Sequence, residues 1–200
     1  MWYNIYENTD KTGRARIAYM GYPRIPPLFY KEDGMARTVG ELVIYGTSGV
    51  CRIEDLRDES FAGAPRRYYI LRPLTETGNT RIYVPADNEA LVAGMQELLS
   101  GEALIETVAN TPAYGTEEWP QDGRARNKRC KELLSSGNRE CLIRLVKTVK
   151  GGTQTPTPAE ESACLRAAAM LYQEFSLSLE LDLPDMIPFL LGEVSVNIRK

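Results

Sequence analysis

Short runs of β-branched and aromatic residues, separated by turn residues, occupy the chain between Val39 and Pro85. The runs are, in order, ELVIYG, VCRIEDLRDE, RRYYILRPL and TRIYVP. The breaks between them are Thr47-Ser48-Gly49, Ala62-Gly63-Ala64-Pro65 and Thr77-Gly78-Asn79, which are typical of turns. Strands this short and this closely spaced indicate a small antiparallel β-barrel. Pro85 ends the last strand, because proline has no N–H to donate to a neighbouring strand.

Helical signals follow the strands. Asp87 can cap a helix that runs to about Leu99, and Ser100 can open a short second helix. Residues 110–123 are then expected to form a polar hinge, because they are rich in Pro, Gly and acidic residues.

Three longer helical segments are predicted after the hinge. The first covers residues 124–136 and stops at Gly137, since glycine readily adopts the left-handed conformation that ends helices. Asn138 caps the second, and Thr157 opens the third in a capping box with Glu160. The positions expected to be buried are Leu142, Leu145, Val146 and Val149 in the second helix, and Leu165, Ala168, Tyr172, Phe175 and Leu179 in the third.

These patterns predict an α+β protein, in which a small antiparallel β-barrel of SH3/Tudor-like type precedes an all-α helical domain. The expected segments are an extended or disordered leader over residues 1–34, the barrel over 35–86, a helical connection and hinge over 87–114, and the helical domain over 115–200.

The leader has a second interpretation. Residues 31–34, Lys-Glu-Asp-Gly, can be encoded by a purine-rich stretch that resembles a ribosome-binding sequence, and Met35 follows at once. We therefore hypothesise that Met35 is the natural start. A genuine flexible arm over residues 1–34 is an equal alternative.

Composition and termini are those expected of a soluble cytoplasmic protein. The chain is 43% hydrophobic and 26% charged, and it contains no apolar run of the roughly 18–20 residues that a membrane span needs. Charges are scattered through the first 21 residues, where a signal peptide would have an apolar core.

The cysteine and histidine content argues against metal sites and catalysis. The four cysteines (Cys51, Cys130, Cys141 and Cys164) are far apart, and the chain has no histidine. A structural zinc site is therefore not expected, and no cofactor is predicted. The absence of histidine also removes the commonest general base, and the turn at Gly46-Thr47-Ser48-Gly49 lacks the spacing of a nucleophile elbow. We expect a protein that is not an enzyme.

Charge is unevenly distributed along the chain. The segment from Arg124 to Lys150 holds nine basic and two acidic residues, a charge of +7, so the remainder carries −10 when the net charge is −3. The basic residues are Arg124, Arg126, Lys128, Arg129, Lys131, Arg139, Arg144, Lys147 and Lys150. A solvated helix face is the ordinary explanation of such a run. The contrast with the acidic remainder favours a local contact with a polyanion.

Two blocks of the sequence resemble the CarD/CdnL family of bacterial transcription regulators. The first comprises VGELVIYGTSGVCRIEDL, FAGAPRRYYILRPL and RIYVPADN, and is similar to the RNA-polymerase-interacting module shared with the transcription-repair coupling factor. The second comprises EEWPQDGRARNKRCKELLSSGN and TPAEESACLRAAAMLYQEF, and resembles the helical DNA-binding domain of the family. Together they span about residues 38–192. The chain departs from the family pattern at Ser48, Cys51 and Gln96.

The resemblance implies two binding sites. Arg81, Ile82, Tyr83 and Val84 would add edge to edge to a strand of the RNA polymerase β subunit. Trp119 would wedge into the minor groove of promoter DNA at the upstream edge of the melted bubble, with contacts that are largely independent of sequence. The cations implied to hold DNA are Arg124, Arg126, Lys128 and Arg129, of which Arg126 and Arg129 are three residues apart and are expected to share a helix face.

The function implied is stabilisation of the open promoter complex by a protein that acts as a monomer, is associated with the nucleoid through polymerase, and does not contact membranes. On sequence alone, a lone tryptophan is more often partly buried core. A protein-interaction adaptor with an SH3-like barrel, in which the helices serve only as a scaffold, is the alternative function.

Overall fold

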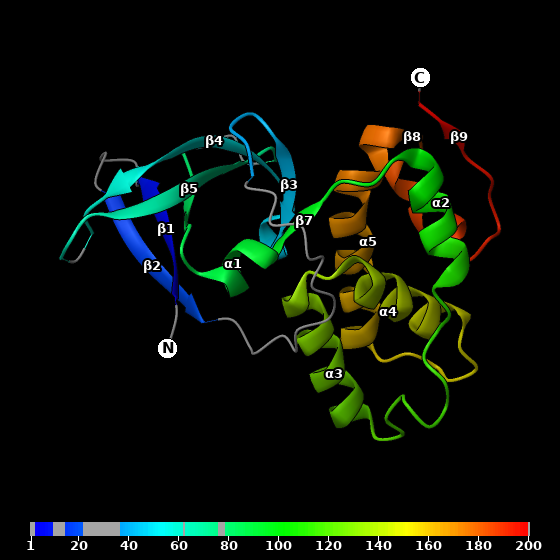
Figure 1. Ribbon diagram of the computed structural model, residues 1–200. Helices are drawn as coiled ribbons and strands as arrows, with labels where there is room; N and C mark the ends of the chain where they lie inside the picture. The colour runs from blue at the N-terminus through cyan, green and yellow to red at the C-terminus, as the bar shows by residue number, and fades with distance from the viewer. Residues whose placement is uncertain (1–2, 10–14, 22–36, 62, 76–78, 200) are drawn as a thin grey trace. The chain divides into compact units, whose positions relative to one another are not determined.

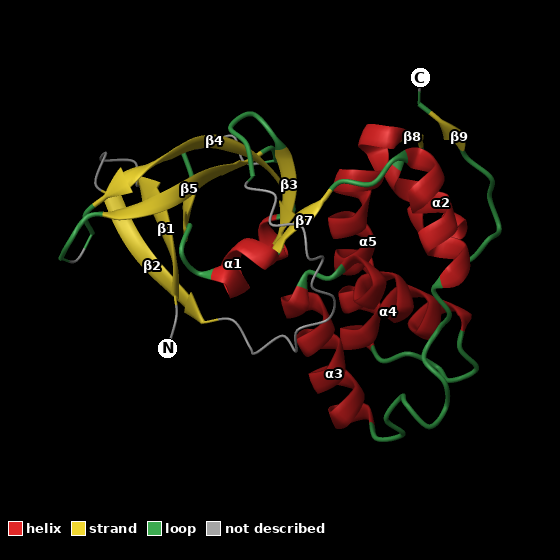
Figure 2. Ribbon diagram, viewed as in Figure 1, coloured by secondary structure: helices red, strands yellow, loops and turns green. Residues whose placement is uncertain are grey.

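The computed structural model describes residues 3–9, 15–21, 37–61, 63–75 and 79–199. The chain divides into two compact units, residues 1–98 and residues 99–200 (Figure 1). The first is built mainly of strands and the second of helices, so the predicted α+β class is confirmed (Figure 2). The boundary divides the expected connection over residues 87–114 between the two units.

One antiparallel sheet of seven strands dominates the first unit, in the order β2-β1-β6-β5-β4-β3-β7. The strands are β1 (Tyr3–Thr9), β2 (Ala15–Gly21), β3 (Leu42–Tyr45), β4 (Val50–Glu59), β5 (Arg66–Pro73), β6 (Arg81–Pro85) and β7 (Met95–Glu97). The four runs predicted from the sequence correspond to β3 to β6. A 3₁₀ turn over Gly46–Ser48 joins β3 to β4, and Gly49 follows it with a φ of 68°, which glycine tolerates.

The predicted barrel is not closed, and this part of the prediction is wrong. In the part of the chain that the structure describes, β2 and β7 lie at the two ends of the strand order and do not pair with each other. Strand β7 extends the sheet beyond β3, and β1 with β2 extends it beyond β6. A bulge at Glu54, between the pairs Ile53–Leu71 and Asp55–Ile70, interrupts the β4–β5 register. The SH3/Tudor-like type stays a prediction.

The core of the sheet follows the alternation of side chains along its strands. One face buries Val43, Tyr45, Cys51, Ile53, Tyr69, Leu71, Ile82, Val84 and Met95, against which Leu91 and Val92 of helix α1 (Glu89–Ala93) pack. A second cluster consists of Tyr68, Ile70 and Tyr83. Phe61 meets the rings of Tyr68 and Tyr83 edge-on, with centroids 5.4 and 4.8 Å away.

The helix expected from Asp87 to about Leu99 is shorter than predicted. It is capped by Asn88, whose side chain accepts a hydrogen bond from the Leu91 N–H, and it ends before Gly94. Met95 then enters the sheet as part of β7 and is 1% exposed. Burial of this side chain beside β3 outweighs the weak helical preference of the segment.

Strands β1 and β2 lie within residues 1–34, for which the sequence indicated no strand. They pair with each other over seven residue pairs, from Tyr3–Gly21 to Thr9–Ala15. Strand β1 also pairs with β6. Met35, the hypothetical start, lies outside the described residues.

The second unit contains four main helices, α2 (Gly101–Asn110), α3 (Gly123–Ser136), α4 (Arg139–Gly151) and α5 (Pro158–Ser178). A 3₁₀ turn (Leu183–Asp185), helix α6 (Met186–Leu190) and the short strands β8 (Leu179–Glu180) and β9 (Asn197–Ile198) complete it. The predicted caps are confirmed: Ser100, Asn138 and Thr157 each accept a backbone hydrogen bond at the start of their helix. Gly137 ends α3 with a φ of 60°, as expected.

The helical core lies where α2 to α6 converge. The predicted face of α4 is buried, and so are Ala168, Phe175 and Leu179. Leu165 is 59% exposed, so the stripe predicted for α5 is displaced at this end, and the buried positions there are Glu160, Cys164, Ala167 and Leu171. Both sets have helical spacing, and only packing against α3 and α4 decides between them. Within the described residues, no helix combines the length and apolarity needed to span a bilayer.

Candidate protein and nucleic-acid interfaces

Strand β6 supplies the residues that the resemblance assigned to polymerase binding. Ile82 and Val84 are 0% exposed in the core of the sheet, and Tyr83 lies in the second cluster. Arg81 is exposed, and its Nε lies 3.1 Å from Oε2 of Glu54 at the bulge of β4. The side chains therefore alternate between the two faces, and only Arg81 presents its side chain to solvent.

The main chain of β6 has a neighbour on each side. Strand β5 pairs with it from Tyr68–Pro85 to Leu71–Ile82. Strand β1 pairs with the opposite side through Ile5–Tyr83, Tyr6–Ile82 and Glu7–Arg81. The edge that a partner strand would use thus carries a strand from the same chain.

Trp119 is buried in the helical unit. Its side chain is 7% exposed, belongs to the helical core and stacks on Tyr114, with ring centroids 5.7 Å apart and an interplanar angle of 20°. A turn holds it there, because the N–H of Trp119 donates to the carbonyl of Gly115 at 3.0 Å. In the conformation described, the indole is not presented to solvent as a wedge, and the DNA-binding role of Trp119 stays a prediction.

Two cationic side chains lie over the ring of Tyr114. The guanidinium of Arg144 lies 3.8 Å from the centre of its ring, and that of Arg129 lies 5.7 Å away. Nη2 of Arg144 is also 2.8 Å from Oε2 of Glu118. Because Glu118 accepts a hydrogen bond from the N–H of Gly115 and lies beside Arg144, its pKa is lowered. These contacts link Tyr114 and Glu118, in the loop before α3, to Arg129 of α3 and Arg144 of α4.

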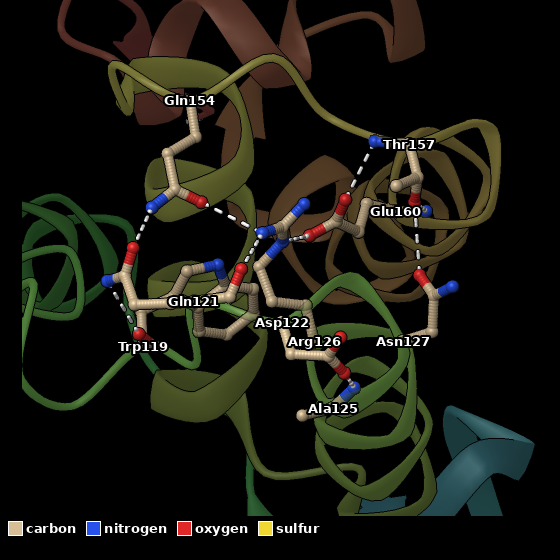
Figure 3. A network of polar contacts seen from close by, with 9 residues as sticks. All are labelled: Trp119, Gln121, Asp122, Ala125, Arg126, Asn127, Gln154, Thr157 and Glu160. Atoms are coloured by element: carbon tan, nitrogen blue, oxygen red, sulfur yellow. Dashed lines mark hydrogen bonds and ion pairs between the residues drawn. The ribbon is translucent and has the colours of Figure 1, made fainter.

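Arg126 forms a polar network with Gln121, with Gln154 and with Glu160 in the first turn of α5 (Figure 3). Its Nε donates to Oε1 of Glu160 at 2.6 Å, and its Nη1 donates to the carbonyl of Gln121 and to Oε1 of Gln154 at 2.8 and 3.0 Å. The Arg126 and Glu160 side chains are 11% and 2% exposed. Glu160 also accepts the Thr157 N–H at 2.7 Å, which completes the predicted capping box. Arg126 is therefore occupied within the protein.

Burial alone would raise the pKa of Glu160, because it removes water from the carboxylate. The hydrogen bonds from Arg126 and Thr157 outweigh this effect, and the pKa is lowered. The carboxylate therefore stays ionised and binds Arg126 as a charged pair. The cap role of Glu160 was predictable from the sequence, but its pairing with Arg126 was not, because the two residues are 34 apart in the chain.

Three more cations of the +7 segment also have internal partners. Arg139 pairs with Glu174 at 2.6 Å, with both side chains at least 87% buried. Lys147 donates to the backbone carbonyls of Val108, in the last turn of α2, and of Thr111, which follows the helix, and burial lowers the pKa of Lys147. Lys150 pairs with Glu161. With Arg126 and Arg144, five of the nine basic residues hold the helices together.

The remaining cations mark an exposed face of α3. Arg124, Lys128 and Lys131 are exposed and spaced four and three residues apart, so they form one stripe along the helix. Within the described part of the chain, none of them forms an ion pair. Arg129 points elsewhere: its Nη1 is 3.4 Å from Oε2 of Glu132, and its guanidinium lies near Tyr114. Arg126 and Arg129 therefore do not act as one solvent-facing pair.

Comparison with known families gives a match to the first unit. Residues 38–98 match the family described as CarD-like/TRCF RID domain. We refer to these residues as the RID domain, after the family whose model they match. The match confirms the resemblance drawn from the sequence over these residues, and it supports a transcription-related function that involves RNA polymerase. No curated protein matches the chain.

The RID domain spans β3 to β7, and strands β1 and β2 precede it. The helical unit lies wholly after residue 98, outside the family match. Its candidate contact residues are therefore inferred from the geometry of this unit alone. Among the residues described, no three Cys, Asp or Glu side chains cluster as a metal site. Cys130, Cys141 and Cys164 are free thiols, and burial raises the pKa of Cys130 and Cys164 to about 11, so these two are protonated at neutral pH.

Proposed function

We propose that the chain is a non-catalytic transcription regulator that binds the RNA polymerase β subunit through its RID domain, contacts promoter DNA through its helical unit, and stabilises the open complex. The RID match over residues 38–98 carries the first part. The unpaired stripe of Arg124, Lys128 and Lys131 supports the second.

The polymerase contact is proposed to be strand addition at β6. Main-chain hydrogen bonds would supply affinity, and the exposed side chain of Arg81 would supply part of the specificity. Because Ile82 and Val84 are core residues, they would act by keeping the strand flat and in register.

The DNA contact is proposed to be made with phosphates. The three cations of the stripe lie on one side of α3, a geometry that fits a row of phosphates and carries no sequence information. Arg129 is 42% exposed and could add a fourth contact next to the stripe. We do not retain minor-groove insertion by Trp119 for the conformation described, because the indole is buried.

The proposed mechanism is differential binding. A sequence-independent contact of this kind is weak alone, with a Kd of roughly 10⁻⁴–10⁻⁶ M. Tethering to polymerase raises its effective concentration. If the tethered protein binds open promoter better than closed promoter by ~1.4 kcal/mol, the ratio of the two shifts about tenfold.

The test removes the stripe and leaves the internal cation network intact. We expect R124Q/K128Q/K131Q to reduce the slope of log affinity against log salt by roughly 2–3 on a short duplex, since each phosphate contact contributes about 0.9. The matched control R52Q/R67Q/R72Q removes the same charge from exposed positions of the RID domain. It should leave the slope unchanged in this polymerase-free assay. With polymerase present, the stripe variant should bind normally and shorten the open-complex lifetime.

A protein-interaction adaptor is the second candidate function. It is favoured by the internal use of five of the nine basic residues, which shows that most of the +7 segment is structural. In that case the RID domain would bind its partner while the helices serve as scaffold. Equal salt slopes and equal open-complex lifetimes for the stripe variant and the native chain would favour the adaptor.

A further inference from the structure

The β1–β2 hairpin occupies the edge of the RID domain that strand addition would use. Strand β1 pairs antiparallel with β6 at Ile5–Tyr83, Tyr6–Ile82 and Glu7–Arg81. Strand β6 is thereby enclosed between β1 and β5, and β2, which lies beside β1, becomes the end of the sheet.

Pairing of this kind excludes a second strand on the same edge. Each residue of a strand has one N–H and one C=O, and these alternate between the two sides. Once β1 pairs with residues 81–83 from one side and β5 from the other, β6 has no free edge there. A partner strand that adds to β6 must therefore displace β1.

We propose that the β1–β2 hairpin is an intramolecular competitor that regulates access of the polymerase strand to β6. The inference rests on the proposed function, because it concerns the same edge. Binding to polymerase then has two steps: the hairpin leaves β6, and the partner strand takes its place. The apparent affinity equals the intrinsic affinity multiplied by the fraction of molecules whose edge is free.

The register shows why the hairpin can leave as a unit. Strand β1 shares seven residue pairs with β2 but only three with β6. The buried side chains that form the main core of the RID domain lie between Val43 and Met95. The family match starts at residue 38, after the hairpin. Undocking would therefore break a short ladder and preserve both the hairpin and the main core of the domain.

The test is a reversible lock in the full-length chain. Glu7 and Arg81 are directly opposite in the register, so E7C/R81C can form a cross-strand disulfide. Both this variant and the matched control R81C carry C141S, because Cys141 is the one native cysteine, among the four, that is not fully buried. Binding to purified polymerase is measured under oxidising and reducing conditions.

We expect the oxidised lock to bind at least tenfold more weakly than its reduced form, and R81C to bind equally in both conditions. Deletion of residues 3–21 should strengthen binding above that of the full chain. The inference is overturned if the oxidised lock binds as well as the reduced form, if oxidation forms no disulfide, or if the deletion leaves affinity unchanged. If the native chain, the reduced lock and the deletion variant all failed to bind polymerase, the proposed function itself would be wrong. The inference would then be lost with it.

Discussion

The indole of Trp119 packs on Tyr114 and on the helical core, and the backbone N–H of the same residue donates to the Gly115 carbonyl, which holds the turn that positions the ring. A side chain buried to this degree contributes chiefly to the stability of the folded state. Its role depends on Tyr114 and on helices distant in sequence. A tryptophan beside a basic helix could therefore not be assigned to core or interface from local pattern alone.

Replacement of Trp119 tests whether its side chain stabilises the helical unit. Trp119→Ala should lower the free energy of unfolding of the helical unit by about 3–5 kcal/mol, because it removes a large buried ring and leaves a cavity. Trp119→Phe is the control and should lose much less, since a ring still meets Tyr114. Urea unfolding followed by circular dichroism measures both. A loss below about 1 kcal/mol for the alanine variant would mean that the indole is exposed, and would restore the DNA wedge.

At the scale of elements, helix caps and strand runs were predictable and their partners were not. Thr157 and Glu160 mark the start of α5 in the sequence, and the structure places the helix there. The second role of Glu160, as partner of Arg126, joins α3 to α5 and depends on how the helices pack. Strand β7 was missed for a similar reason, because three residues become a strand only beside β3.

The pairing of Glu160 leads to a prediction about pH. Glu160→Gln should lower the unfolding free energy at pH 7 by about 1–3 kcal/mol, because Arg126 loses its buried charged partner. The pKa of Glu160 is lower in the folded state than its usual value of 4.5, so its contribution is complete above that value and is lost as pH falls through the folded pKa. The difference between the native chain and the variant should therefore stay constant at neutral pH and shrink in acid.

The neighbouring carboxylate provides the control for this experiment. Glu161 pairs with Lys150 at a site where the side chains are 38% and 28% exposed. Glu161→Gln should therefore change stability by no more than about 1 kcal/mol. Urea unfolding at several pH values from neutral to about 3 compares the three proteins. A difference between the native chain and Glu160→Gln that persisted unchanged in acid would show that the carboxylate is not the source of the stabilisation.

At the scale of the whole molecule, the described residues of each unit form a main hydrophobic core of their own. The side chains of one lie between Val43 and Met95, and those of the other begin at Leu99. The sequence predicted two parts of different class, because its hydrophobic period changes after the strands. The sequence did not predict that β1 and β2 extend the sheet of the first unit. These two strands join a sheet whose other strands come much later in the chain.

Separate cores allow the covalent link itself to be tested. Fragments 1–98 and 99–200 should each fold, but an equimolar mixture at micromolar concentration should extend the open-complex lifetime far less than the intact chain. The reason is that a DNA contact with a Kd of roughly 10⁻⁴–10⁻⁶ M needs the millimolar effective concentration that a short link provides. A chain rejoined by a short Gly/Ser insertion after Leu98 serves as control and should keep most of the effect. If the mixture matched the intact chain, the helical unit would not need to be held at polymerase, and its DNA contact would have to be strong by itself.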